Sequence, residues 1–339
     1  MSVTILDIAG ATGFSKATVS RAFINPELLQ PDTLKTILDA AARMGYRPNA
    51  IARAMITKRT GNLAFIIYGR QAPVITNPFY GPILESVVNA AQRQGFSVFI
   101  VSDEEIRLPS GDLMLQKQVD GVIFASQPDP DMLEMYRCNG TPVVLVNHRS
   151  ELPDMVSVIS DDYQGINLVM DHLYYIGHRR IALLGGNFTE FILHRRQQAY
   201  KDALARFGIP YNDQLVEVAE PHVADAEAGM RRILLRAGAD CPDAVVCMND
   251  TLAVGAIKAL RKAGKRVPED VAVTGYDDST ICALCEPELT SVDGGKERMG
   301  EEAVRLLCDL IAKKTNVESV TLNARLKIRA STAGEAGKE

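Results

Sequence analysis

Two basic residues near the N-terminus have the type and spacing needed to hydrogen-bond to base edges. Lys16 and Arg21, with Ala17 beside the lysine, lie on one side of a short segment whose Val19 and Phe23 point the other way. On a helix this pattern exposes the two cations together. Lysine and arginine can donate to the acceptor edge of guanine, whereas alanine offers only a methyl group. The segment is therefore a candidate for reading DNA in the major groove.

Three short helices are predicted to position these residues. Thr4 can cap the first helix with Asp7 as its capping-box partner, and that helix ends near Gly13. Ser15 can cap the second helix, and Pro31 occupies a favoured first helical position in the third. Two short helices joined by a tight glycine turn form a helix-turn-helix, whose second helix enters the major groove. The residues expected to pack between the helices are Ile5, Ile8, Ala9, Val19, Phe23, Leu34, Ile37, Leu38, Ala41 and Ala42.

The charge distribution agrees with contact to DNA at one end of the chain. Residues 1–60 hold eight Lys or Arg and four Asp or Glu, a net charge of +4. The whole chain carries −5, which leaves −9 for the remainder. A basic head on an acidic body indicates phosphate contact by the head alone.

The composition argues against several other classes of protein. Of the 339 residues, 47% are hydrophobic and 23% charged, no apolar run approaches 18 residues, and the N-terminus opens directly into the capping pattern, so we expect a cytoplasmic protein. The six cysteines fit reduced thiols, and the spacing of Cys282 and Cys285 is weak evidence for a metal site. Phosphate-loop, dinucleotide-binding and His/Cys metal motifs are missing, so neither enzyme activity, a cofactor nor a metal is expected.

From Asn62 onward, short apolar runs alternate with amphipathic segments of helix length. This alternation predicts parallel sheets covered by helices, an α/β architecture. Ten strands exceed one comfortable sheet, so two doubly wound lobes are expected. The predicted strands are 63–68, 98–101, 121–125, 143–146, 156–159, 181–184, 215–218, 244–248, 271–274 and 289–292.

Several motifs together resemble the LacI/GalR family of bacterial transcription repressors. In the head they are Thr-Ile-x-Asp-Ile-Ala from residue 4, Gly-x-Ser-x-Ala-Thr-Val-Ser-Arg from residue 13, and Gly-Tyr-Arg-Pro-Asn from residue 45. In the body they are Asn-Pro-Phe at 77–79, Asp-Gly-Val-Ile at 120–123, Gly-His-Arg-Arg-Ile-Ala at 177–182, Asn-Asp-x-x-Ala-x-Gly-Ala at 249–256, and 267–278. The resemblance implies an all-α DNA-binding head joined to an effector domain similar to periplasmic sugar-binding proteins.

The resemblance also assigns residues of the head. Lys16, Ala17 and Arg21 match positions that read bases, and residues 49–55 match a hinge helix that folds when two copies meet on DNA. In the hinge, Ala52 and Met55 would enter the minor groove, where Met55 replaces the usual leucine; core packing is the alternative for Met55. The expected phosphate contacts are Thr4, Ser15, Thr18, Thr33 and Asn49. For Thr4, Ser15 and Thr18, simple helix capping is the alternative interpretation.

The domain organisation follows from the same resemblance. We expect a DNA-binding domain at 1–48, a hinge and linker at 49–60, an effector-binding and dimerisation domain at 61–330, and a disordered tail at 331–339. The chain should cross between lobes near Ser160–Asp161, Glu288–Asp293 and Asn316–Val320. The first lobe would then hold 61–160 and 293–317, and the second lobe 161–288 and 318–330.

Ligands of α/β sheets bind beyond the carboxyl ends of the strands, which selects the candidate effector site. Amide, carboxylate and guanidinium groups around an aromatic ring suit a polyhydroxylated ligand. Helix capping by Asn249 and turn closure by Asp277 are the alternative interpretations. The candidate effector-binding residues are Pro78, Phe79, Asn147, Arg196, Asn249 and Asp277.

Two features bear on the nature of the ligand. Glu190 and Ile192 stand where purine-responsive family members carry Arg and Thr, so a purine is not expected. The run His194-Arg195-Arg196 suggests an acidic or phosphorylated sugar, although consecutive helical residues diverge by about 100° and only one should face the site.

The function expected from these observations is a transcriptional regulator, a repressor of a carbohydrate-utilisation operon under allosteric control of a sugar-like effector. It should bind an inverted-repeat operator in double-stranded DNA as a homodimer. The alternative is a solute-binding protein of a sugar transporter, which the basic head argues against.

Overall fold

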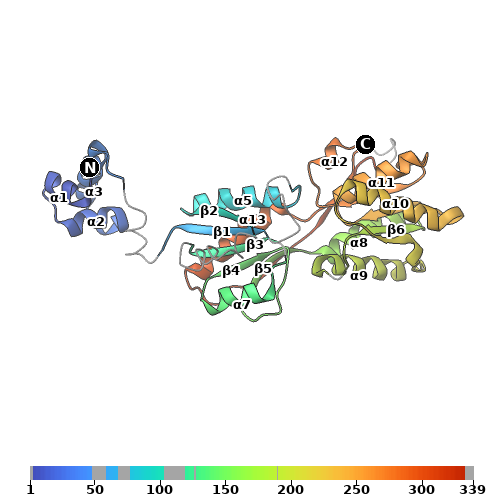
Figure 1. Ribbon diagram of the computed structural model, residues 1–339, viewed down its shortest axis with the longest axis horizontal. Helices are drawn as coiled ribbons and strands as arrows, with labels where there is room; N and C mark the ends of the chain where they lie inside the picture. The colour runs from blue at the N-terminus through green and yellow to red at the C-terminus, as the bar shows by residue number, and fades with distance from the viewer. Residues whose placement is uncertain are drawn as a thin grey trace. The chain divides into compact units, whose positions relative to one another are not determined.

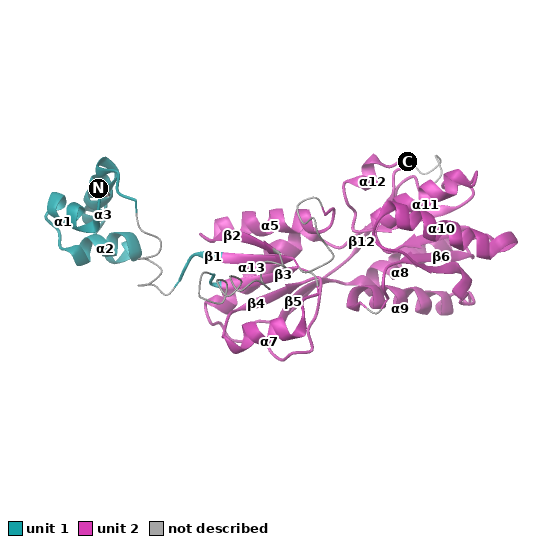
Figure 2. Ribbon diagram, viewed as in Figure 1, with its two compact units in different colours: residues 1–62, 112–120 teal, residues 63–111, 121–339 magenta. Residues whose placement is uncertain are grey.

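The computed structural model describes residues 3–47, 59–67, 77–102, 119–125, 127–188 and 190–332. The chain forms two compact units, Met1–Asn62 with Asp112–Asp120 and Leu63–Gly111 with Gly121–Glu339 (Figure 2). The expected hinge at 49–55 lies outside the described residues.

The first unit contains the three predicted helices, α1 (Ile5–Thr12), α2 (Lys16–Ile24) and α3 (Pro31–Met44), with a 3₁₀ turn at Pro26–Leu28. The capping box forms as expected: the Asp7 amide donates to Thr4 Oγ1 over 3.4 Å, and the Thr4 amide donates to the Asp7 carboxylate over 2.8 Å. The buried apolar core is made by Ile8, Val19, Ala22, Ile37, Ala40 and Ala41.

Two residues of α3 that were expected in this core are exposed instead. Leu38 is 42% exposed, and Ala42 also faces solvent. The buried stripe of α3 follows Ile37, Ala40 and Ala41, with Leu34 half-buried, and these positions recur at helical spacing. Leu38 and Ala42 each directly follow a buried residue, so each lies about 100° around the helix from its buried neighbour.

The second unit has two lobes, each built on a six-stranded, mainly parallel sheet (Figure 1). Lobe 1 has the strand order β11-β5-β4-β3-β1-β2, in which the pairings from β11 through β1 are parallel. Its strands are β1 (Asn62–Ile67), β2 (Ser97–Ser102), β3 (Gly121–Ala125), β4 (Val143–Val146), β5 (Val156–Ser160) and β11 (Val320–Leu322). Its helices are α5 (Tyr80–Arg93), α7 (Pro130–Cys138) and α13 (Lys296–Ile311).

Lobe 2 has the order β12-β10-β9-β8-β6-β7, in which only β12 pairs antiparallel among the described pairings. Its strands are β6 (Ile181–Gly185), β7 (Val216–Val218), β8 (Ala244–Cys247), β9 (Ala272–Tyr276), β10 (Thr290–Asp293) and β12 (Arg325–Lys327). Its α-helices are α8 (Asp162–Tyr175), α9 (Phe191–Arg206), α10 (Val223–Ala237), α11 (Asp250–Lys262) and α12 (Ile281–Leu284), with 3₁₀ turns at Asp213–Leu215 and Gly238–Asp240.

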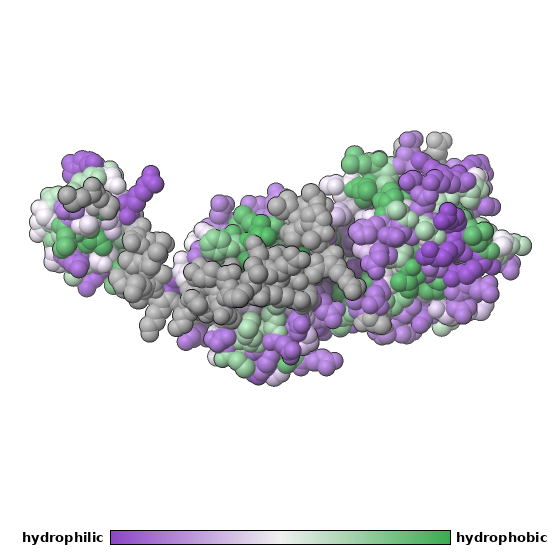
Figure 3. Space-filling view, in the orientation of Figure 1, coloured by the Kyte–Doolittle hydropathy of each residue, from purple (hydrophilic) through white to green (hydrophobic). Residues whose placement is uncertain are grey.

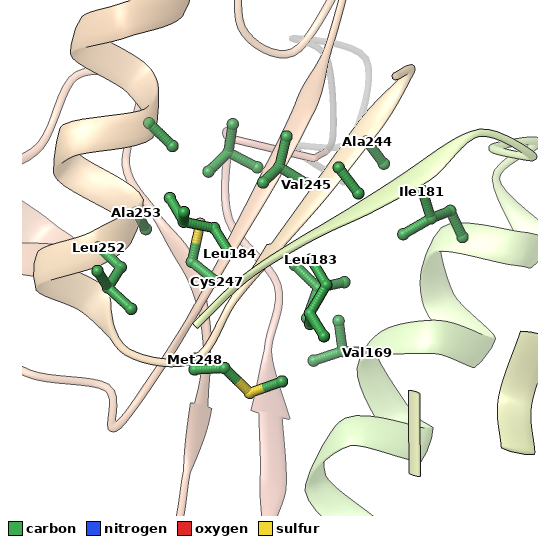
Figure 4. Close-up of a cluster of buried hydrophobic side chains, with 14 of the residues drawn as sticks. Val169, Ile181, Leu183, Leu184, Ala244, Val245, Cys247, Met248, Leu252 and Ala253 are labelled. Carbon is green, nitrogen blue, oxygen red and sulfur yellow. The ribbon is translucent and has the colours of Figure 1, made fainter. Parts of the chain in front are cut away.

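The lobe 2 core shows why its strands read as continuous apolar runs. Ile181, Leu183, Val245 and Cys247 lie between helices on the two faces of the sheet, so both faces are buried (Figure 4). Cys247 is a buried free thiol here, and the other five cysteines are free as well.

The chain crosses between lobes three times, and one crossing differs from the prediction. The first lies at Asp161, after β5, and the second at Gly294–Gly295, between β10 and α13. The third was expected at Asn316–Val320, but β11 pairs with β5 in lobe 1, so the chain crosses only after Leu322. The Asp161 amide donates to the Leu322 carbonyl over 2.8 Å, which joins the first and third crossings.

The expected disordered tail begins too early in the sequence prediction. Ser331 is fully buried, and its hydroxyl donates to the Val273 carbonyl over 2.6 Å. Thr332 is also buried and shares a 2.8 Å hydrogen bond with Thr290. These two residues therefore belong to lobe 2, and 333–339 lie outside the described part of the chain.

Candidate functional site

The N-terminal unit presents the predicted recognition residues on one surface. Lys16 and Ala17 are exposed at the start of α2 and Arg21 is exposed in its last turn, while Val19 is fully buried. No acidic residue lies in the first turn of this helix. The helix N-terminus carries partial positive charge, which adds to that of Lys16 where a phosphate or base acceptor would approach.

The polar residues expected at phosphates also act as caps. The Ser15 hydroxyl accepts a 3.1 Å hydrogen bond from the Thr18 amide and lies 2.9 Å from the Thr18 hydroxyl. Thr4 caps α1, and Thr33 is half-buried in the first turn of α3. Capping therefore accounts for Thr4 and Ser15 without excluding a phosphate contact. Asn49, Ala52 and Met55 lie outside the described residues.

Arg196 is the centre of the second candidate site, where the two lobes meet. This residue is only 4% exposed. Its Nε donates to Asp162 over 2.7 Å, its Nη1 donates to the Met248 carbonyl over 2.5 Å, and its Nη2 lies 3.8 Å from the Asp277 carboxylate. The guanidinium lies 3.4 Å from the ring centroid of Tyr276. Two of the three guanidinium nitrogens therefore donate hydrogen bonds to protein atoms, and the third lies near Asp277.

Asp277 follows β9 with a backbone φ of 103°, in the left-handed region. Burial raises the pKa of its carboxyl to about 8; Arg196 and Lys296 oppose the shift, while Asp250 and Asp162 add to it. The carboxyl group is therefore a proton-binding group near neutral pH, placed beside a permanent cation.

Asp250 lies behind this site and holds the segment that follows Asp277. Its carboxylate accepts from the Ser279 amide and hydroxyl, each over 2.7 Å, and from the Ser291 hydroxyl over 2.5 Å. Burial raises the pKa of Asp250 as well. The role of Asp250 is structural: it fixes the loop between β9 and α12.

Lobe 1 contributes Asn147 and Tyr80. Asn147 follows β4 with a φ of 60°, its Nδ2 donates to the Tyr80 hydroxyl over 3.3 Å, and its buried Oδ1 has no hydrogen-bond partner within the described structure. Burial raises the pKa of Tyr80, and Asp277, Glu190 and Arg196 of lobe 2 also act on it. The two lobes therefore direct their polar groups toward the same region.

The remaining predicted site residues have mixed outcomes. Phe79 is half-buried and lies edge-on to Tyr80, with ring centroids 4.9 Å apart, whereas Pro78 is exposed. Asn249 caps α11 by accepting a hydrogen bond from the Leu252 amide over 2.8 Å, so its side chain has the helix-capping role that was the alternative to ligand binding. The contact to Arg196 comes from the carbonyl of the preceding residue instead.

Sequence reasoning missed Asp162, Tyr276 and Tyr80. Asp162 directly follows the predicted first crossing, so the rule about strand carboxyl ends could have identified it. Tyr276 lies within the family-like segment 267–278, next to Asp277. No periodicity distinguishes the inward-facing Tyr80 from the neighbouring Phe79.

Among the described residues no helix is long and apolar enough to cross a membrane, and no cluster of three metal-ligating side chains occurs.

Comparison with known proteins finds a matching family model for each of the two units. Residues 4–49 match the model for bacterial regulatory proteins of the lacI family, and residues 170–332 match a periplasmic binding protein-like domain. The transcriptional regulator CelR of Thermobifida fusca is 33% identical over 97% of this chain and 98% of its own length. Catabolite control protein A of Priestia megaterium is 32% identical over 98% and 100%.

Solved structures agree with these sequence relatives. A complex of CelR with cellobiose aligns with a TM-score of 0.75 at 32% identity, covering 97% of this chain and 99% of that one. A lac repressor dimer bound to operator and the anti-inducer ONPF has a TM-score of 0.82 at 24% identity over 98% and 99%, which supports the fold. The relatives are regulators rather than transporter components, and the chain belongs to the lacI family of bacterial transcriptional regulators.

Proposed function

We propose that this regulator represses a carbohydrate-utilisation operon and is controlled by a neutral sugar bound where the two lobes meet. The observation that carries the proposal is the arrangement of Arg196, Asp162 and Asp277 in lobe 2, directed toward Asn147 and Tyr80 in lobe 1. Amide, carboxyl and phenol groups of this kind exchange hydrogen bonds with sugar hydroxyls. Relatives with the same two units support a link between such a site and DNA binding.

The charges argue for a neutral ligand and against the acidic sugar suggested by the run of basic residues. His194 is exposed, so it lies away from the buried face of α9. Arg195 lies 3.7 Å from Asp161, and Arg196 is committed to Asp162 and Asp277. An anionic ligand would have to compete with Asp161 for Arg195 or with Asp162 for Arg196, whereas a hydroxyl can donate to Asp277 or to Asn147 Oδ1.

DNA binding would use two heads brought together by a homodimer. Phe99 and Ile100 of β2 are 47% and 46% exposed, and Leu284 of α12 is 81% exposed. Hydrophobic residues gather on the visible surface of both lobes (Figure 3). A second copy covering them would remove apolar area from water and place two α2 helices on an inverted repeat. This mode of action corresponds to a cytoplasmic protein without catalytic activity.

Thermal unfolding of the full-length protein tests the effector class. The panel is cellobiose, glucose, gluconate, glucose 6-phosphate and adenosine, each at millimolar concentration. CelR is known as a cellobiose complex, so cellobiose is the first neutral probe. A ligand at a hundred times its Kd should add about 2.7 kcal/mol, a shift of several degrees. A shift by a neutral sugar that disappears in Asp277→Ala but persists in Asp131→Ala, a change at an exposed position of α7, supports the proposal. A shift by the anionic probes alone contradicts it.

Operator binding is measured separately. Double-stranded DNA selected from random sequence should contain an inverted repeat, and the effector should change its affinity. Equal affinity with and without a sugar that demonstrably binds would contradict allosteric control.

A further inference from the structure

Lys296 is a buried cation whose described partners are backbone carbonyls. It is the first residue of α13 and is 4% exposed. Its Nζ donates to the carbonyl of Asp277 and, over 3.1 Å, to the carbonyl of Asp278. Burying a lysine costs free energy unless its donors are satisfied, so two converging carbonyls are a built site for this ammonium group.

The two carbonyls belong to an unusual stretch of backbone. Asp277 has a φ of 103° and Asp278 a φ of 45°, so two consecutive residues other than glycine adopt left-handed conformations. Such residues persist where surrounding contacts over-determine them, and they often occur at functional sites. This kink turns the chain directly after β9 and sets the direction of the Asp277 carboxyl toward Arg196.

The side chain of Asp278 is held differently from its carbonyl. Lys327 of β12 and Arg329 just after it each donate to the Asp278 carboxylate over 2.6 Å. Both residues come from the part of the chain that lies in lobe 2, so these ion pairs fix the kink within its own lobe. The contact from Lys296 is of another kind, because α13 packs on lobe 1.

The attachment of α13 to lobe 1 is tight. The Ser86 hydroxyl of α5 donates to the Glu297 carbonyl over 2.5 Å. A Cβ on Gly300 would lie 2.7 Å from the Ile83 carbonyl oxygen, so the two helices approach as closely as glycine permits. Helices α5 and α13 must therefore move together, and α5 begins at Tyr80, beside Asn147 of the candidate effector site.

We propose that Lys296 is a positioning residue that holds the Asp277–Asp278 kink and ties it to α13 of lobe 1. The inference rests on the proposed function in so far as Asp277 contacts the effector. A ligand hydroxyl that displaces the Asp277 segment would then act on α13 and α5 through one side chain. Lobe movement and the orientation of Asp277 become linked through contiguous contacts.

Hydrogen exchange measured by mass spectrometry on the effector-free, full-length protein tests this inference without any ligand. Lys296→Met removes the donors while keeping an apolar chain of similar length. Exchange should rise about tenfold at residues 277–280, where the Asp277 amide donates to Val292 and the Asp278 amide to Ser291, and also in the first turns of α5. Lys296→Arg, which keeps the donors, should restore most of the protection.

Lys314→Met is the matched control, because Lys314 is exposed near the other end of α13. It should leave exchange at 277–280 and in α5 unchanged. Wild-type exchange in Lys296→Met would overturn the proposal, and so would faster exchange spread evenly over both lobes, since Lys296 would then stabilise the fold only.

Calorimetric titration with cellobiose provides a second readout. If wild type binds, Lys296→Met should weaken binding by about tenfold or more and Lys296→Arg by much less; equal affinities in all three would count against the positioning role. If wild type does not bind cellobiose, the choice of effector is wrong, and the exchange experiment still decides the role of Lys296.

Discussion

Replacing Asp277 by asparagine is expected to remove a pH dependence from the stability of the protein. Burial raises the pKa of Asp277 to about 8 in the folded state, whereas an unfolded Asp titrates near about 3.9. Between these values the unfolded chain has released its proton and the folded chain retains it. Raising the pH therefore favours the unfolded state, and the contribution of this group is lost progressively up to the folded pKa.

The size of the effect follows from this difference in bound protons. One proton retained by the folded state changes the free energy of unfolding by up to about 1.36 kcal/mol per pH unit. From pH 5 to pH 7 the wild type should lose up to about 2.7 kcal/mol through Asp277, and Asp277→Asn should lose none of it. The Asp277 side chain is only 14% exposed, so solvent screening reduces this effect little. Asparagine has the shape of the protonated acid and keeps an acceptor toward Arg196.

Urea unfolding followed by far-UV circular dichroism at pH 5, 6 and 7 measures the difference in slope. One protein concentration must be used throughout, because association would shift the apparent stability. Asp131→Asn, which removes an exposed carboxylate from α7, controls for the loss of one charge. If wild type and Asp277→Asn lose stability in parallel between pH 5 and 7, Asp277 is ionised in the folded protein and the argument from burial is wrong.

Three further substitutions test other parts of the structure. Arg21→Ala should weaken specific operator binding by about 1 to 3 kcal/mol and relax the preference at one base pair in a fluorescence-anisotropy competition; equal loss on all sequences would mean a phosphate contact only. Gly300→Ala should lower the free energy of unfolding by about 1 to 2 kcal/mol despite better helix propensity, because its Cβ meets α5 backbone; a stabilised variant would show that the helices can separate. Asp120→Asn should cost about 1 to 3 kcal/mol in urea unfolding, since its carboxylate accepts from the amides of Thr60 and Gly61 over 2.6 and 3.0 Å; wild-type stability would assign these amides other acceptors.

Local signals were sufficient to predict the DNA-binding head. A helix cap involves residues only three positions apart in the sequence. The caps formed by Thr4 with Asp7 and by Ser15 with Thr18 therefore depend on local sequence and not on tertiary packing. The prediction that Leu38 is buried was wrong. An apolar residue beside the buried stripe of a helix cannot be distinguished from one within the stripe until the packing partners are known.

The sheets were predicted wherever a strand is buried on both faces. Strands β11 and β12 were missed because each is a short edge strand without an apolar run, and β12 alternates Arg, Leu and Lys. The equally short β7 was predicted because Leu215 directly precedes its two valines. An apolar run is the signal for a central strand, and an edge strand does not require one. The error in the third crossing followed directly from these two omissions.

The candidate site could be predicted only in part. The position of Asp277 after a strand is visible in the sequence, and the helical spacing of residues 194–196 indicated that one basic residue would face inward. The sequence does not tell which of the three residues faces inward. It also does not tell that Arg196 would donate to Asp162 and to the Met248 carbonyl, because these contacts depend on how three separate elements pack together. The same holds for Lys296, which is 18 residues from the nearer of its two carbonyl partners.

Burying several ionisable groups at this site costs free energy, and this cost bears on why the groups are there. Asp162 and Asp250 are buried with Arg196 and Lys296, and the Asp277 side chain beside them is 14% exposed. Well-packed apolar residues in their place would often give equal or greater stability. Such groups remain where their charge serves another state of the molecule. A sugar hydroxyl that donates to Asp277 stabilises its ionised form and so offsets the desolvation that raises its pKa. The same event strengthens the attraction of Asp277 to Arg196 and Lys296, one in each lobe. Ligand binding and lobe position are therefore coupled through one carboxyl group, and an apolar core at this position could not provide that coupling.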